Sequence, residues 1–259
     1  MSDVNIPEKV LDEKSIKLII KSINDSRIEL RQHLVQRGFK TNNGRYQDRW
    51  NYLFNNIGQN FKDTNFKCYV VDRGPLWSFI VLYDANSETI YIVFRKNTFL
   101  NINKNKELNH YARMLNSINL RNIYPKEPIA VQGTFSFLKK NVTLSDLTSN
   151  IHQQLDDMIG EIQRDAKLCV NILFEENNNR LTSISGNIAN YNLEIKKSYN
   201  WDKFISPTIE EIIDTEDIEL DESHKIIDLK IRKEKFNQTE KEDMVGKKQN
   251  KNKKDKNKN

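Results

Sequence analysis

The stretch FKCYVVDRGPLWSFIVLYDANSETIYIVFR, residues 66–95, decides the fold that the sequence predicts. It contains three runs rich in Val, Ile, Phe, Tyr and Trp, at 66–72, 76–83 and 89–95, and these residue types favour the pleated surface of a β-sheet. The short segments RGP and DANSE separate the runs and have the composition of tight turns. The stretch therefore predicts a three-stranded antiparallel meander, whose apolar middle strand is expected at the centre of a sheet.

Helical periodicity precedes the meander. Apolar residues recur every three or four positions over 11–23 and again over 28–35, which predicts two amphipathic helices. Asn24 or Asp25 is expected to cap the second of these helices, because short polar side chains accept a hydrogen bond from the first turn. Gly38 is expected to end it, since glycine readily adopts the left-handed conformation that follows many helices.

The segment NNGRYQDRWNYLFNN, residues 42–56, predicts a third helix over 44–57 with two adjacent stripes. The first stripe is apolar and is expected to face the core: Tyr46, Trp50, Leu53, Phe54 and Ile57. The second stripe is polar and basic: Arg45, Arg49, Tyr52 and Asn56. Its residue types are suited to binding a ligand, so this helix is both a core element and a candidate binding element.

Further helices and strands follow the meander. Residues 103–118 and 143–167 have helical periodicity, whereas 129–137, 167–175 and 181–195 have the composition of strands. The sequence contains no internal repeat. This order of elements predicts a single α+β domain, in which a mostly antiparallel sheet, made of the meander and the later strands, packs with about five helices.

The distribution of charge predicts a folded body followed by a charged C-terminal region. The body is expected to be one domain at 1–204, and residues 205–245 are expected to form a weakly ordered acidic extension, since 209–222 contain eight acids and no base. Residues 246–259 contain seven Lys, one Asp and no core-forming residue, which predicts a disordered Lys/Asn-rich tail. The net charge of the chain is +5. Residues 1–208 alone carry +6, so the body is mildly basic.

The predicted location is the cytoplasm, and no membrane partner is expected. No apolar run approaches the roughly 20 residues that a helix needs to cross a bilayer. The N-terminal segment MSDVNIPEKVLDEK lacks the basic start and apolar stretch of a signal peptide. Cys68 and Cys169 lie in apolar, strand-like runs, and both are predicted to be buried free thiols.

No complete motif for a metal, a cofactor or a catalytic nucleophile occurs in the sequence, which therefore predicts no cofactor and no metal site and does not indicate an enzyme. The four histidines, His33, His110, His152 and His224, are not spaced with other ligands as zinc requires. His110 is the one weak candidate for a catalytic residue, because it precedes Tyr111 on a predicted helix and its side chain could line a cleft. The alternative is a solvated helical histidine.

Basic and aromatic residues form a candidate binding site. Its members are Arg45, Arg49, Tyr52, Arg73, Arg95, Lys96 and Arg113. If they converge, they form a basic pocket for phosphate or carboxylate, because the guanidinium fork matches both groups. The alternative is a set of solvated cations whose aliphatic stems cover apolar surface. The sequence leaves both interpretations open.

Four runs, NNGRYQDRWNYLF, VDRGPLWSFIVLYD, IYIVFRK and HYARMLNSIN, resemble a bacterial family of intracellular proteins of unknown function. That family is associated with low-GC Gram-positive bacteria and their mobile elements, and the resemblance covers roughly residues 10–175. It implies a cytoplasmic bacterial protein with a role in phage conflict or genome maintenance. It implies no catalytic residue.

Three functional hypotheses follow. The first is a nucleic-acid-associated protein that binds polyanions through its basic body and tail, with an affinity that falls as salt rises. The second is a protein–protein interaction module whose acidic segment at 209–222 folds on a partner. The third is an enzyme that acts on a phosphate-bearing substrate in a pocket formed by Arg49, Arg73, Arg95 and His110.

Overall fold

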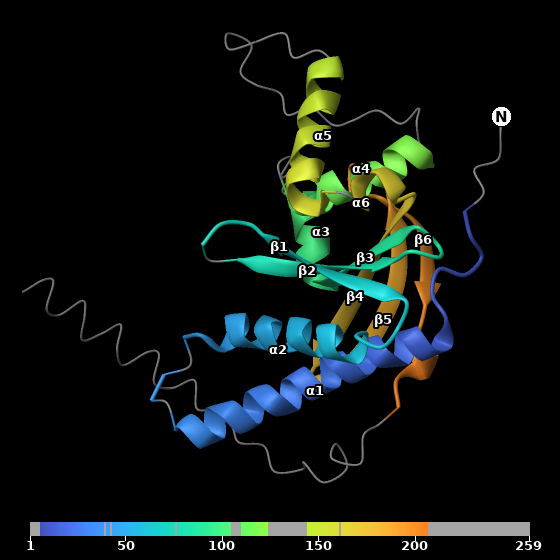
Figure 1. Cartoon of the computed structure of the whole chain (residues 1–259). Coiled ribbons are helices and arrows are strands. Elements are labelled where there is room, and N and C mark those ends of the chain that lie inside the picture. The colour runs from blue at the N-terminus through green and yellow to red at the C-terminus, as the bar shows by residue number, and fades with distance from the viewer. Residues whose placement is uncertain are drawn as a thin grey trace, which may run out of the picture. The chain divides into compact units, whose positions relative to one another are not determined.

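The structure is a computed structural model of the 259-residue chain. It describes residues 6–38, 40–41, 43–75, 77–104, 110–123, 144–160 and 162–206, which belong to one compact unit, Met1–Pro207 (Figure 1). The strand predicted at 129–137 and the tail at 246–259 lie outside the described residues, as does all but the beginning of the extension predicted at 205–245.

Six strands form one sheet, in the order in which they occur along the chain. They are β1 (Phe66–Asp72), β2 (Ser78–Asp84), β3 (Thr89–Arg95), β4 (Leu168–Asn177), β5 (Arg180–Ala189) and β6 (Ile195–Asn200). All neighbours are antiparallel except β3 and β4, which run parallel along Thr89–Arg95 and Leu168–Phe174. The predicted meander and the α+β class are confirmed. The parallel pair was not predicted, and it arises because helices carry the chain from the end of β3 back to the start of β4.

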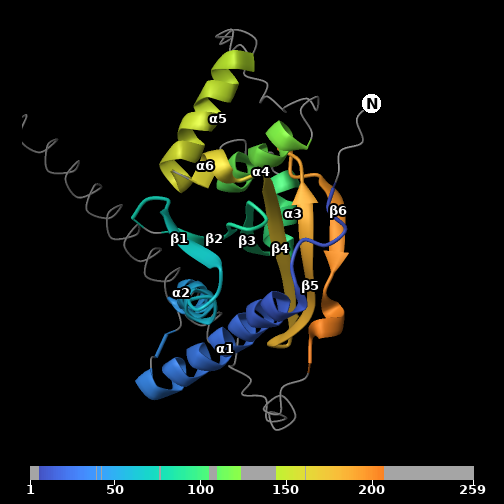
Figure 2. The same ribbon diagram turned by 45° about the vertical axis from the view of Figure 1, so that its right-hand side comes forward.

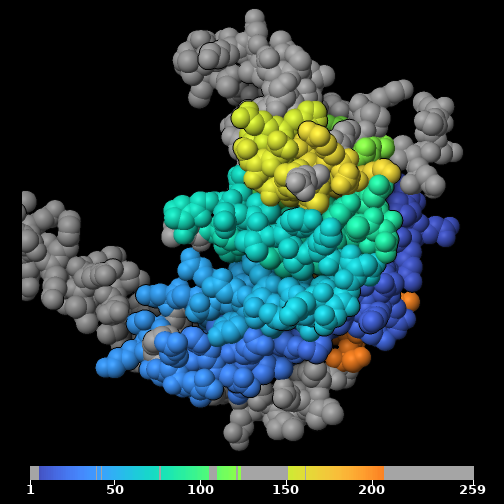
Figure 3. Space-filling view, in the orientation of Figure 1, coloured from blue at the N-terminus to red at the C-terminus, as the bar shows by residue number. Residues whose placement is uncertain are grey.

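The helices cover both faces of the sheet. They are α1 (Glu13–Arg37), α2 (Arg45–Asn60), α3 (Lys96–Lys104), α4 (Tyr111–Asn122), α5 (Leu144–Ile159) and α6 (Ile162–Asp165), and the short 3-10 helix η1 (Asp202–Phe204) follows β6. One hydrophobic cluster joins α1 and α2 to the sheet, and a second joins α3 to α6 to its other face (Figures 1 and 2). Figure 3 shows these layers in contact, with α1 and α2 in blue below the teal strands and α5 in yellow above them.

The first helix is continuous, so the prediction of two helices in this region is wrong. The Asp12 carboxylate caps α1 by accepting a hydrogen bond from the Ser15 backbone N–H at 2.7 Å, and Gly38 ends the helix with a φ of 55°. Asn24 is buried inside α1, and Asp25 pairs with Lys21 one turn earlier at 2.6 Å. Asn24 and Asp25, whose side chains could cap a helix, therefore lie in the interior of α1.

Buried asparagines fix α4 against the sheet. The Asn119 side-chain amide donates to the backbone carbonyls of Cys169 and Ala189, each at 2.8 Å, and its oxygen accepts from the Cys169 N–H at 2.7 Å. Asn116 and Asn171 exchange hydrogen bonds at 2.8 and 3.0 Å, and both side chains are fully buried. Asn119 thus satisfies backbone groups near the end of the β4–β5 ladder, as a neighbouring strand would.

The second and third strands separate toward one end. β2 and β3 pair only along Leu82–Asp84 and Thr89–Tyr91. Beyond this, the ring of Tyr111 stacks between those of Phe79 on β2 and Phe94 on β3, at centroid distances of 4.2 and 5.6 Å. Tyr111 therefore packs between the side chains of the two strands where they part, and this is the end of β3 that leads into α3.

The two cysteines differ in exposure. Both are free thiols, and Cys169 is buried as predicted, whereas Cys68 is exposed, contrary to the prediction. Cys68 lies on β1, which is an edge strand of the sheet and has several exposed positions. An apolar run of sequence does not distinguish such an edge strand from a central one.

Candidate functional site

A pocket of about 470 Å³ opens where β3 and β4 end. It is lined by Arg95, Lys96, Asn97, Thr98, Phe174, Glu175, Glu176, Asn177 and Thr182. The β4–β5 ladder shifts register between Glu175 and Glu176. Successive strand residues normally point to opposite faces, so this irregularity helps to explain how two consecutive glutamates line one pocket. Ligands of sheets with parallel strands commonly bind outside the carboxyl ends of those strands, which is the position of this pocket.

One wall of the pocket is the junction between β3 and α3. Arg95 is the last residue of β3 and Lys96 is the first of α3, so no loop separates the strand from the helix. The backbone N–H groups of a first helical turn lack partners within the helix, and this end of a helix carries partial positive charge. Lys96, Asn97 and Thr98 are the first-turn residues that line the pocket, so side-chain and backbone donors meet there.

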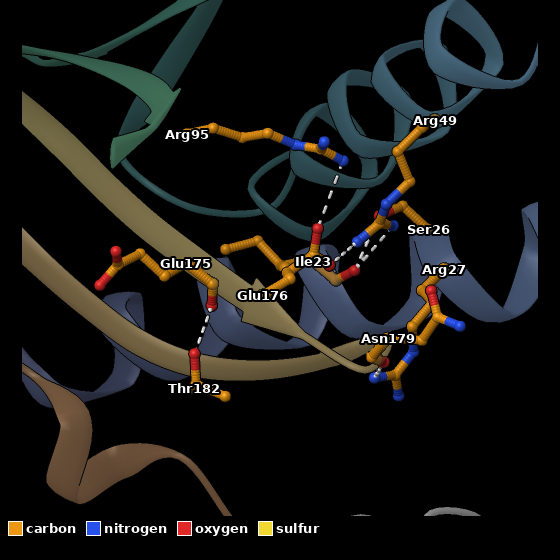
Figure 4. Close-up of polar contacts among 9 residues, drawn as sticks. All are labelled: Ile23, Ser26, Arg27, Arg49, Arg95, Glu175, Glu176, Asn179 and Thr182. Atoms are coloured by element: carbon orange, nitrogen blue, oxygen red, sulfur yellow. Dashed lines mark hydrogen bonds and ion pairs between the residues drawn. The ribbon is translucent and has the colours of Figure 1, made fainter. Parts of the chain in front are cut away.

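Ion pairs link the cations and the glutamates of the pocket. The Lys96 Nζ lies 2.8 Å from Oε2 of Glu175, and the Arg95 Nη2 lies 3.4 Å from Oε2 of Glu176. Arg49 pairs with the other oxygen of Glu176, so two guanidinium groups share one carboxylate (Figure 4). Three cations thus face two carboxylates. The Nε of Arg95 is buried and has no hydrogen-bond partner among the described residues.

Arg49 connects three elements beneath the pocket. From α2, its Nη1 donates to the Ile23 carbonyl at 3.0 Å and to the Ser26 hydroxyl on α1, while its Nη2 binds Glu176 on β4 (Figure 4). Burial lowers the pKa of the Arg49 guanidinium, and the Glu176 carboxylate opposes that shift. The side chain is 8% exposed. Arg49 therefore positions Glu176 rather than facing solvent.

The structure places the other predicted binding residues elsewhere. Arg45 is partly buried at the start of α2, and the Tyr52 hydroxyl lies 2.9 Å from Nδ1 of His33. Arg73 is exposed in the turn between β1 and β2. Arg113 is buried on the opposite face of the sheet, where its Nη1 lies 3.4 Å from the Tyr191 carbonyl. Of the seven residues, only Arg95 and Lys96 line the pocket, and Arg49 lies beneath it, paired with Glu176.

His110 has a local structural role. It is the N-cap of α4, and its Nδ1 accepts a hydrogen bond from the Ala112 N–H at 3.1 Å. Tyr111 follows it in the sequence, and burial raises the pKa of the Tyr111 hydroxyl, an effect that a hydrogen bond with Trp77 and the charge of Arg73 partly offset. His110 does not line the pocket.

Glu175, Glu176 and Thr182 are pocket residues that the sequence analysis did not identify. Two consecutive acids at the end of a predicted strand were the available signal. Such acids commonly belong to turns, and the periodicity of a strand places only alternate residues on one face. The ladder irregularity that accompanies their shared location could not be read from the sequence.

An aromatic cluster lies beside the pocket. The ring of Trp50 on α2 contacts those of Phe174, Trp77 and Phe54 at centroid distances of 6.1, 5.9 and 5.2 Å. Tyr46, one turn before Trp50, is 73% exposed, so the prediction that it belongs to the core is wrong. The physical reason is its position at the beginning of α2, where the buried contacts of this helix begin only with Arg49.

Neither a cluster of metal-ligating side chains nor a membrane-spanning helix occurs in the described part of the chain. No group of three or more His, Cys, Asp or Glu side chains there is arranged to hold a metal ion. None of the helices in these segments has the length and apolar character that a membrane span requires.

Comparisons with known proteins identify a family without a known activity. Searches of the curated proteins and of the solved structures find no match to this chain. A family model described as a family of unknown function, DUF5986, matches residues 5–247, nearly the whole sequence. The chain therefore belongs to the DUF5986 family.

Proposed function

We propose that this protein binds nucleic acid or a similar polyanion, and that the pocket between β3, α3 and β4 holds one of its phosphate groups. The observation that carries the proposal is the pair of cations, Arg95 and Lys96, that line the pocket, while buried Arg49 beneath it neutralises part of the charge of Glu176. A phosphate supplies several acceptor oxygens, and Lys and Arg side chains are its usual partners.

The ion pairs at the pocket mouth are of a kind that a phosphate can replace. The side chains of Lys96 and Glu175 are 42% and 34% exposed, and pairs exposed to this degree contribute little to stability. Arg95 is 36% exposed and its contact with Glu176 is long, at 3.4 Å. A phosphate that displaces Glu175 from Lys96 would also lie beside the first turn of α3, whose residues Lys96, Asn97 and Thr98 line the pocket.

The charge of two parts of the chain supports the same function. Residues 1–208 carry a net charge of +6 and residues 246–259 carry another +6, whereas the acidic segment at 209–222 carries −8. Cations of this density attract polyanions over distances set by ionic strength, without sequence preference. In this proposal the protein is bacterial and cytoplasmic, and nucleic-acid binding serves phage conflict or genome maintenance.

The test compares two lysines at opposite ends of the parallel strand pair. Lys96 pairs with Glu175 at the pocket, whereas Lys167 pairs with Glu88 next to the start of β4. Affinity for a fluorescent oligonucleotide is measured by anisotropy on the full-length protein. K96Q should weaken binding about tenfold, because it removes a charge-assisted contact worth roughly 1.5 kcal/mol. K167Q should bind as the wild type does.

A third variant separates phosphate binding from a general effect of net charge. E175Q removes the carboxylate that competes for Lys96, so it should bind the oligonucleotide more tightly than the wild type. E88Q makes the same change in net charge beside Lys167 and should have a smaller effect. Equal effects of E175Q and E88Q, or of K96Q and K167Q, would show that the pocket holds no phosphate.

A further inference from the structure

Tyr46 exposes an aromatic side chain on α2, the helix that also carries Trp50. Tyr46 and Trp50 are four residues apart on α2, which places them on one face of the helix, and Trp50 is partly buried. The Trp50 ring contacts Phe174, whose residue lines the pocket. Tyr46 thus lies in solvent one helical turn from Trp50, and Trp50 packs on Phe174, which is 2% exposed, beside the cations Arg95 and Lys96.

Two arginines are neighbours of these aromatic residues, one along the chain and one through the backbone. Arg45 precedes Tyr46 at the start of α2. Trp77, which contacts Trp50 at 5.9 Å, accepts a backbone hydrogen bond from the N–H of exposed Arg73 at 2.8 Å. Aromatic rings interleaved with cations are the combination that binds single-stranded nucleic acid, since rings stack on bases and cations contact phosphates.

We infer that this surface binds single-stranded nucleic acid, with a base stacked on Tyr46, a neighbouring base against Trp50, and a phosphate in the pocket at Lys96 and Arg95. The inference rests on the proposed function and specifies its ligand. In a duplex, neighbouring base pairs cover the faces of each base, so these rings could contact only its backbone. Only an unpaired strand offers base faces and phosphates to the same surface.

Tyr46 permits a test in which folding is not at risk, because its side chain is largely exposed. The full-length protein is titrated with labelled dT20, rU20 and a 20-base-pair DNA duplex. The wild type should bind at least one single strand more tightly than the duplex. Y46A should weaken binding of that strand about fivefold or more and leave duplex binding unchanged, whereas Y46W should retain it. The matched control is V70A, which truncates a side chain that is 70% exposed on β1.

Tryptophan fluorescence provides a second readout. Trp50 and Trp77 are partly buried near the pocket, whereas Trp201 is 5% exposed and packs against β5. Stacking of bases should quench the emission of the wild type, and W50F should lose a large part of this quenching.

The possible outcomes separate this inference from the proposed function. Equal affinity for duplex and single strands, with Y46A unchanged but K96Q weakened, would overturn the single-strand inference and leave phosphate binding standing. Absence of binding to all three probes would overturn both. A preference for rU20 or dT20 that Y46A removes supports the inference and identifies the natural strand as RNA or DNA.

Discussion

Arg49 lies where α1, α2 and β4 meet, and its contacts explain why a residue that resembles a ligand-binding arginine is instead part of the framework. Its guanidinium contacts a carbonyl and a hydroxyl of α1 and a carboxylate of β4. In the sequence, Arg49 belongs to a basic stripe beside the apolar face of its helix. A side chain in such a stripe can be either exposed to solvent or buried at the edge of the core. The deciding partner, Glu176, lies 127 residues away in the chain.

Replacing Arg49 should therefore affect stability before it affects binding. R49M leaves the partly buried Glu176 with one cation and removes one of the two side-chain donors to the Ile23 carbonyl, so we expect the free energy of unfolding to fall by about 3 kcal/mol. Urea denaturation followed by circular dichroism measures the change. The matched control is K17M, which removes one partner of the exposed Lys17–Glu13 pair and should change stability little. A loss for R49M as small as that for K17M would contradict this role.

Asn119 is a second residue whose role is set by its contacts. N119A leaves the N–H and carbonyl of Cys169 and the carbonyl of Ala189 buried without this partner. Because each unsatisfied buried group costs about 1–3 kcal/mol, we expect a loss of about 3 kcal/mol or more in a urea titration. N51A, at an exposed position of α2, should stay within about 0.5 kcal/mol of the wild type. Equal stability of the two variants would refute the role of Asn119.

At the scale of elements, the sequence predicted strands better than it predicted their partners. The three runs between 66 and 95 became β1, β2 and β3 nearly as predicted. The parallel pairing of β3 with β4 could not be predicted, because a strand buried on both faces has the same composition whichever direction its neighbour runs. The pocket depends on that pairing, since it lies at the carboxyl ends of these two strands.

The contact between β5 and the residue that follows β6 gives a prediction at this scale. A Cβ added to Gly186 would lie 2.4 Å from the ring of Trp201, which is buried and cannot move freely. G186A should therefore displace Trp201 and lower the free energy of unfolding by about 1–3 kcal/mol. Chemical denaturation followed by tryptophan emission measures the free energy of unfolding, and the emission of the folded protein reports the displacement of Trp201.

The control is a glycine without such a neighbour. Gly58 lies inside α2, and a Cβ there would meet nothing within 4 Å, so G58A should stabilise the protein by about 0.5–1 kcal/mol. If G186A were as stable as the wild type, this result would contradict the close packing of the Trp201 ring on Gly186 of β5.

At the scale of the whole molecule, the sequence gives the sign of the net charge, whereas only the fold shows which charged residues are neighbours. The mildly basic body was evident from the sequence, whereas the meeting of Arg95 and Lys96 with Glu175 and Glu176 depends on the fold. Arg113 illustrates the limit of prediction from sequence, because it belonged to the same candidate set and yet its side chain is buried, on the face of the sheet that α4 covers. Spacing along the chain predicts which face of a helix a residue occupies, but it does not predict what that face contacts.

The most direct test of phosphate binding at this pocket is the salt dependence of oligonucleotide affinity. Each phosphate contact made by a cation contributes about one unit to the slope of log affinity against log salt concentration. We expect K96Q to give a slope shallower than that of the wild type by about one unit, and K167Q to give the wild-type slope. Parallel lines for the wild type and K96Q would contradict the claim that Lys96 contacts a phosphate.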